Sequence, residues 1–117
     1  MRSGKALSLI AMVVLAAGLA WAVDKTGAPY MKAVEPETAK AGDVVKVIGD
    51  YLDKERVAEV YLTKGNTDLK VDIVEQAPDY IRFKVPLRAA AGRYGLMFLT
   101  AGPDPKLLEQ PVFLLVE

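Results

Sequence analysis

The 117-residue sequence contains no cysteine and no histidine, and its two serines, Ser3 and Ser8, both lie near the N-terminus. Beyond residue 8 the chain therefore cannot supply a Ser-His or Cys-His site for acyl transfer, and it lacks the usual ligand sets for zinc, copper and haem. A catalytic pair of carboxylates needs a deep cleft, which so small a chain does not offer. The sequence thus favours a protein that is not an enzyme and has neither a cofactor nor a bound metal.

The chain also has no excess of charge of either sign, since 15 basic side chains balance 15 acidic ones. Proteins that bind nucleic acids or anionic lipids present basic surfaces, because binding neutralises phosphate charges and releases counterions. The charge balance therefore argues against nucleic-acid binding, and the length indicates one domain.

The N-terminus has the layout of a secretory signal peptide. Arg2 and Lys5 precede an uncharged stretch over residues 6–23, and small residues on both sides of Trp21 provide a cleavage pattern. We therefore expect residues 1–22 to be a signal peptide.

The alternative is an uncleaved membrane anchor, but alanine and glycine at residues 16–18 lower the hydrophobicity and favour cleavage. The two N-terminal cations predict export in either case, to the periplasm, the cell surface or the medium. The protein would contact the membrane only if the leader is retained, and without a cysteine it cannot be a lipid-anchored lipoprotein.

Removing residues 1–22 leaves 13 basic and 15 acidic side chains, a net charge of −2. Residues 23–29 are polar and contain glycine and proline, which predicts a flexible tether to a domain over residues 30–117. Short apolar runs with strand periodicity then alternate with turn signals, and none has the length and period of an amphipathic helix. They predict an all-β sandwich of about seven strands, at residues 31–34, 44–48, 57–63, 69–74, 80–85, 93–100 and 107–116.

Turn and strand residues recur in an order that resembles the IPT/TIG domain, an immunoglobulin-like fold shared by plexins, Rel-type transcription factors and many bacterial surface proteins. Pro36 ends the first strand, Gly42 and Gly49 permit turns around the second, and Pro86 closes an edge. The resemblance covers residues 30–117, and it implies a non-enzymatic interaction module. The segments that carry it are residues 31–36, 41–49, 57–62, 81–86 and 92–96, together with Leu52.

The resemblance also implies which side chains of the later strands face the core, namely Val60, Leu62, Tyr94, Leu96, Phe98, Phe113 and Leu115. The opposite face then carries a largely apolar set where polar side chains are usual, namely Tyr61, Met97, Leu99, Val112, Leu114 and Val116. This set is either a patch for protein binding or self-association, or a face that segments 23–30 or 101–108 cover.

The resulting functional hypothesis is an exported, non-catalytic binding or assembly module, which contacts another envelope or extracellular protein, or itself, through an apolar sheet face or an edge strand. Carbohydrate binding is the alternative, because sugars stack on exposed aromatic rings and Tyr30, Tyr51, Tyr61 and Tyr80 are available. The lack of tryptophan after Trp21 weakens this alternative.

Asp50, Asp53 and Glu55 could gather around a hard cation such as Ca²⁺, since all three supply oxygen ligands. Their spacing is not that of an EF-hand, and Lys54 and Arg56 dilute the negative charge. A solvated turn without metal is therefore the preferred interpretation.

Overall fold

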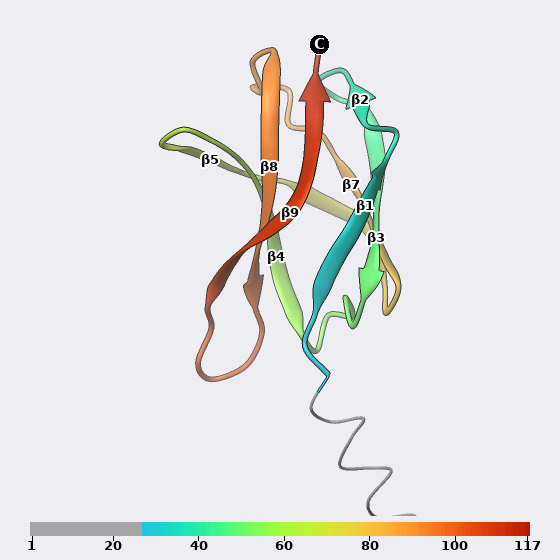
Figure 1. The fold of residues 1–117 in the computed structure, drawn as a ribbon, viewed down its shortest axis with the longest axis vertical. Coiled ribbons are helices and arrows are strands. Elements are labelled where there is room, and N and C mark those ends of the chain that lie inside the picture. The colour runs from blue at the N-terminus through green and yellow to red at the C-terminus, as the bar shows by residue number, and fades with distance from the viewer. Residues whose placement is uncertain (1–26) are drawn as a thin grey trace, which may run out of the picture.

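A computed structural model describes residues 27–117. The expected signal peptide, and all of the expected tether except residues 27–29, lie outside the described residues. The described chain forms nine strands and no helix (Figure 1). The strands are β1 (Tyr30–Glu35), β2 (Thr38–Ala39), β3 (Val44–Asp50), β4 (Val57–Lys64), β5 (Thr67–Lys70), β6 (Asp72–Ala77), β7 (Tyr80–Lys84), β8 (Gly92–Thr100) and β9 (Leu107–Val116). Residues 27–117 accordingly hold no helix that could span a bilayer.

The strands form two sheets with the orders β1-β3-β7-β6 and β2-β9-β8-β4-β5. All neighbours are antiparallel except β2 and β9. An immunoglobulin sandwich packs strands ABED on strands GFC, with C′ added beside C, and the two sheets here follow that order. The expected immunoglobulin-like β-sandwich is thus confirmed.

The strand count differs from the expected seven at two places. The run over residues 69–74 splits into β5 and β6, because the chain leaves one sheet for the other at Val71. The short strand β2 follows β1 directly and joins the other sheet, a transfer that no alternating pattern signals. Between β4 and β5 the expected hairpin turn is present, with Gly65 at a φ of 60°.

The inner faces of both sheets supply the core. Fully buried side chains include Val47 and Phe83 from the four-stranded sheet and Leu62 and Phe98 from the five-stranded sheet. Tyr94 closes the core near the start of β8, and its hydroxyl donates a hydrogen bond to the Ala90 carbonyl at 2.8 Å. This arrangement matches the tyrosine corner of immunoglobulin-like domains.

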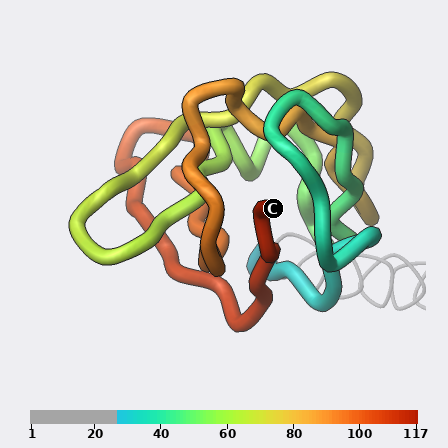
Figure 2. The backbone as a smooth tube through the Cα atoms, turned by 90° about the horizontal axis from the view of Figure 1, so that it is seen from above, coloured from blue at the N-terminus to red at the C-terminus, as the bar shows by residue number. Residues whose placement is uncertain are grey.

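The two sheets meet on one side where β1 lies beside β9, as Figures 1 and 2 both show. Gln110 of β9 spans this junction, because its side-chain Oε1 accepts a hydrogen bond from the Met31 amide of β1 at 2.8 Å. The junction places the free side of β9 next to the free side of β1, and it positions the site described below.

Candidate binding groove

The side chains of strand β9 point to the opposite faces of the sheet from those that the sequence predicted. Val112, Leu114 and Val116 are buried, whereas Phe113 and Leu115 are 48% and 46% exposed. The prediction was therefore wrong for all five residues, and the first three do not belong to an outer patch. The inward orientation of Val60, Leu62, Tyr94, Leu96 and Phe98 is confirmed.

The cause is the pairing of β9 with β8. Tyr94 faces the core and pairs with Leu114, so Leu114 faces the core as well. A register shift follows, since Gly95 pairs with Phe113 while Leu96 pairs with Gln110. Five consecutive apolar residues contain no alternation, so only this register sets which of them point inward.

The other predicted patch residues, Tyr61, Met97 and Leu99, do lie on the outer face of the five-stranded sheet. Tyr61 pairs with Met97, which is only 8% exposed although it lies outside the core cluster. Since Met97 is covered and its neighbours are half-buried, these side chains do not form an open apolar patch.

Polar groups interrupt the same face. The Tyr61 hydroxyl donates a hydrogen bond to the Glu59 carboxylate, and Lys70 forms an ion pair with that carboxylate at 3.0 Å. The bond from Tyr61 and the contact with Lys70 lower the pKa of Glu59, and the bond to Glu59 raises the pKa of Tyr61. This part of the face is a polar network rather than an apolar patch.

The free side of β9 is only partly covered. Strand β1 lies beside it near Gln110, which bonds the Met31 amide, and β2 pairs with it at Leu115 and Val116. The Leu115 amide donates to the Glu37 carbonyl at 2.8 Å, and the Glu117 amide donates to the Ala39 carbonyl at 2.9 Å. Backbone groups of a strand alternate in direction with a period of two, so the Phe113 amide faces the same side. At Phe113, however, the ladder with β2 has already ended.

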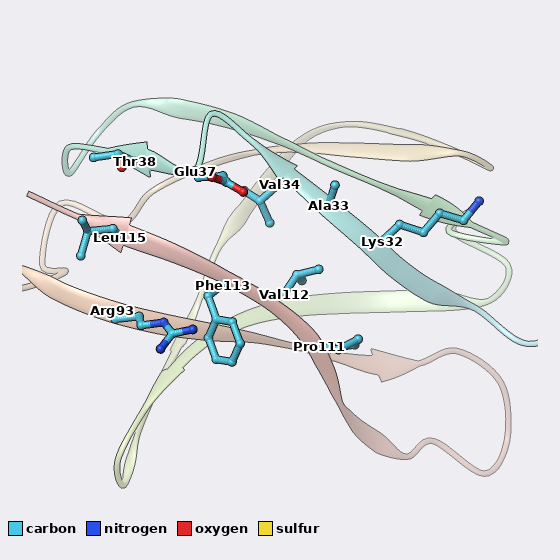
Figure 3. Close-up of a pocket in the computed structure, with 10 residues that line it drawn as sticks. All are labelled: Lys32, Ala33, Val34, Glu37, Thr38, Arg93, Pro111, Val112, Phe113 and Leu115. Carbon is cyan, nitrogen blue, oxygen red and sulfur yellow. The ribbon is translucent and has the colours of Figure 1, made fainter.

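A groove of about 500 Å³ lies at this position, between β9 on one side and β1 and β2 on the other (Figure 3). The buried side chains of Val34 and Val112 contribute its apolar part. Its volume falls within the range of roughly 300–1,000 Å³ that is usual for ligand sites. The full lining is Lys32, Ala33, Val34, Glu37, Thr38, Arg93, Pro111, Val112, Phe113 and Leu115.

Arg93 and Phe113 form the outer wall of the groove, and Figure 3 shows the guanidinium beside the aromatic ring. The guanidinium carbon lies 4.0 Å from the ring centroid, a cation–π contact. The ring also covers Gly95, where an added Cβ would lie 3.7 Å from it. The ring therefore contacts two neighbours, and the cation–π contact favours this position of the exposed guanidinium.

The sequence did not predict this groove. The signals that could have found it are Pro36, which ends β1 early, and Pro111, which interrupts β9. Neither proline shows that the chain between β1 and β2 changes sheets and leaves β9 partly uncovered.

The four tyrosines considered for sugar stacking do not share one surface. Tyr61 lies on the outer face of the five-stranded sheet, whereas Tyr80 lies in the four-stranded sheet and donates to Glu75 at 2.8 Å. Tyr30 and Tyr51 are 46% and 38% exposed near the start of β1. They therefore do not build a single stacking platform.

The three acidic residues weighed as cation ligands have different partners. Asp50 pairs with Lys32 at 3.0 Å, and Asp53 pairs with Arg56 at 3.1 Å. Glu55 lies in the turn before β4. Within residues 27–117 no group of three or more potential ligands is placed to hold a metal ion.

No family model and no curated protein matches the sequence. Among solved structures, the chain is similar to SGBP-B from the mixed-linkage glucan utilization locus of Bacteroides ovatus, in complex with a mixed-linkage heptasaccharide, with a TM-score of 0.55 and 18% identity. It is also similar to a protein of Bacteroides thetaiotaomicron named as a candidate phosphatase, with a TM-score of 0.53 and 16% identity.

Both comparisons cover 79% of this chain but only 24% and 19% of the respective structures. The chain thus spans about a quarter of one neighbour and about a fifth of the other. At these identities the likeness shows the β-sandwich fold and nothing finer.

Proposed function

We propose that this protein is an exported, non-catalytic binding module of the IPT/TIG type, which binds another protein of the cell envelope along the free side of β9. The observation that carries the proposal is the short ladder between β2 and β9, which ends at Leu115 beside a groove of about 500 Å³. An extended segment of a partner can add to such an edge, because backbone hydrogen bonds supply affinity and pockets for alternate side chains supply specificity.

The surroundings of the groove support a protein partner. Phe113 and Leu115 present half-exposed apolar side chains, and a new strand would use the backbone groups of Phe113, since the Leu115 amide already bonds the Glu37 carbonyl. Interfaces of this kind combine an apolar centre with a polar rim, and here Lys32, Glu37 and Arg93 provide the rim.

The absence of serine, cysteine and histidine beyond residue 8 supports a non-catalytic role. Within residues 27–117 the acidic side chains whose pKa is perturbed, Glu59 and Glu75, are held by tyrosine and cationic neighbours on opposite sheets rather than in the groove. Among the groove residues the pKa of Lys32 is raised, and the cause is its exposed hydrogen bond and ion pair with Asp50, a surface contact rather than the arrangement of an active site.

Site-specific photo-crosslinking tests the proposal. The full chain is expressed in its source organism with a photo-reactive phenylalanine at Thr38, which lines the groove, or at Val74, a 56% exposed control position on β6. We expect an adduct of defined mass from Thr38 and none of the same mass from Val74. An adduct of twice the chain's mass would identify a second copy as the partner, and equal adducts from both positions would refute the groove as the binding site.

Carbohydrate binding is the second candidate, favoured by the fold likeness to a protein solved with a mixed-linkage heptasaccharide. Calorimetric titration of the exported chain with mixed-linkage glucan oligosaccharides tests it. Binding that is lost when Tyr30 or Tyr51 is replaced by alanine would support a sugar site near the start of β1. A flat titration, together with a glycan array that gives no signal, would remove this candidate.

A further inference from the structure

Arg93 differs from the two arginines that hold carboxylates in the described part of the chain. Arg56 bonds Asp53 and Arg82 bonds Glu75, both at 3.1 Å. The ion pairs found within residues 27–117 do not include Arg93, whose guanidinium stacks on the Phe113 ring. Its planar group of N–H donors therefore stacks on the ring and forms no ion pair with a carboxylate of residues 27–117.

A guanidinium stacked in this way can receive a carboxylate. Its donors match both oxygens of a carboxylate, and stacking on an aromatic face reduces the entropy lost when the bond forms. The position beside the free edge of β9 suggests what carries the carboxylate. A strand added at that edge would place one of its outward side chains opposite Phe113, about 5 Å away, and so within reach of the Arg93 side chain.

The rest of the groove restricts the segment further. Val34 and Val112 are buried and apolar, so inward side chains of the added strand should be apolar as well. Glu37 lines the opposite wall, on the segment between β1 and β2, and would repel a second acid there. Lys32 is already paired with Asp50 at 3.0 Å. The attraction for an acid is therefore concentrated at Arg93.

We propose that the groove accepts an extended segment of a partner protein that carries apolar residues at alternate positions and one aspartate or glutamate opposite Phe113, bound by Arg93. This inference rests on the proposed function and specifies the chemistry of the partner. A protein segment fits better than an acidic polysaccharide, because a polysaccharide has no backbone amides to pair with the edge of β9 and would leave the apolar part of the groove unfilled.

Selection from a random peptide library displayed on phage, with the exported protein as bait, tests this chemistry. We expect the enriched peptides to share alternating apolar residues and one acid. The synthetic consensus peptide should bind at least roughly tenfold more weakly to Arg93→Gln, because a hydrogen-bonded charged pair is lost. Arg88→Gln is the matched control, since Arg88 is exposed and lies outside the groove. Circular dichroism melting of both variants verifies that they are folded.

A charge reversal makes the test specific to the contact. The consensus peptide with its acid replaced by lysine should bind poorly to the wild type and regain affinity for Arg93→Glu. Three outcomes would refute the proposed acidic segment. They are enriched peptides that contain no acid, equal binding to the wild type and Arg93→Gln, and a selection that enriches no peptide. Arg93-dependent binding of an oligouronate probe in place of peptides would assign the groove to an acidic glycan.

The proposed function and the inference of an acidic partner segment can be refuted separately. If crosslinking from Thr38 gives a partner adduct that Arg93→Gln leaves unchanged, the binding module stands and the carboxylate contact is wrong. If Thr38 gives no adduct at all, the proposed function itself fails.

Discussion

The inverted orientation of β9 leads to a sharp prediction for two adjacent leucines. Leu114 has no exposed surface, whereas Leu115 is 46% exposed. Replacing a fully buried leucine by alanine costs about 2–5 kcal/mol, because transfer free energy is lost and a cavity remains. Replacing a half-exposed leucine removes only part of the transfer term, about 1 kcal/mol or less.

The two substitutions should therefore separate clearly in a melting experiment. For a domain of this size, 1 kcal/mol lowers the melting temperature by roughly 4–8 °C. With a loss of about 3 kcal/mol, Leu114→Ala should melt roughly 12–24 °C lower than the wild type, and Leu115→Ala no more than about 8 °C lower. Urea unfolding followed by circular dichroism gives the matching free energies of unfolding.

Lysine at the same positions extends the test. Leu114→Lys would bury a charge without a partner and should prevent folding, since the whole domain is stabilised by only about 5–15 kcal/mol. Leu115→Lys should fold, because its side chain can extend into solvent. Equal losses for the two positions, or a larger loss at Leu115, would refute the register of β8 and β9 from which the groove is derived.

Three further predictions concern other parts of the sandwich. Tyr51 has a φ of 58°, so Tyr51→Gly should be more stable than Tyr51→Ala by about 1 kcal/mol, and thermal melts of both variants check the order. The Gln76 side chain donates to two backbone carbonyls at 2.8 and 2.9 Å, so Gln76→Ala should cost about 1–3 kcal/mol, and Gln76→Glu more because a carboxylate cannot donate. The hydroxyl of Tyr80 and the guanidinium of Arg82 lower the pKa of Glu75. Its contribution to stability is therefore present above the ordinary glutamate value of about 4.3 and is lost as the pH falls through the lowered pKa. Glu75→Gln should flatten that part of the acid melting curve, and an unchanged slope would contradict the pKa shift.

The sequence predicted the sandwich because local patterns determine most of it. Residues 80–85 alternate polar and apolar side chains, and β7 buries Ile81 and Phe83 as that alternation requires. A strand of this kind carries its orientation in its own composition, so a single sequence is enough to assign its faces. The inward residues of β4 and β8 are instead assigned from the resemblance to the IPT/TIG domain, since apolar Met97 and Leu99 leave β8 without full alternation.

The groove could not be predicted for the opposite reason. Between Val112 and Val116 every side chain is apolar, so no local pattern distinguishes the two faces of β9. The orientation follows from Tyr94 on another strand, and the uncovered edge follows from the point at which β2 begins. Both are long-range properties of the fold, which composition and periodicity do not encode.

The edges of the two sheets indicate where a partner can bind. Exposed edges invite pairing with other chains, and proteins protect them with bulges, charges or short strands. Edge strand β1 has a register shift between Met31 and Ala33, and edge strand β6 has one between Ile73 and Glu75. Edge strand β5 has only four residues, most of them exposed and two of them charged. Strand β9 also has a register shift, since Gly95 pairs with Phe113 and Leu96 with Gln110, but between that shift and β2 the Phe113 backbone lies beside the groove and two half-exposed apolar side chains. This gap favours binding at β9 over binding on a sheet face, where the networks around Glu59 and Glu75 place polar groups on both outer surfaces.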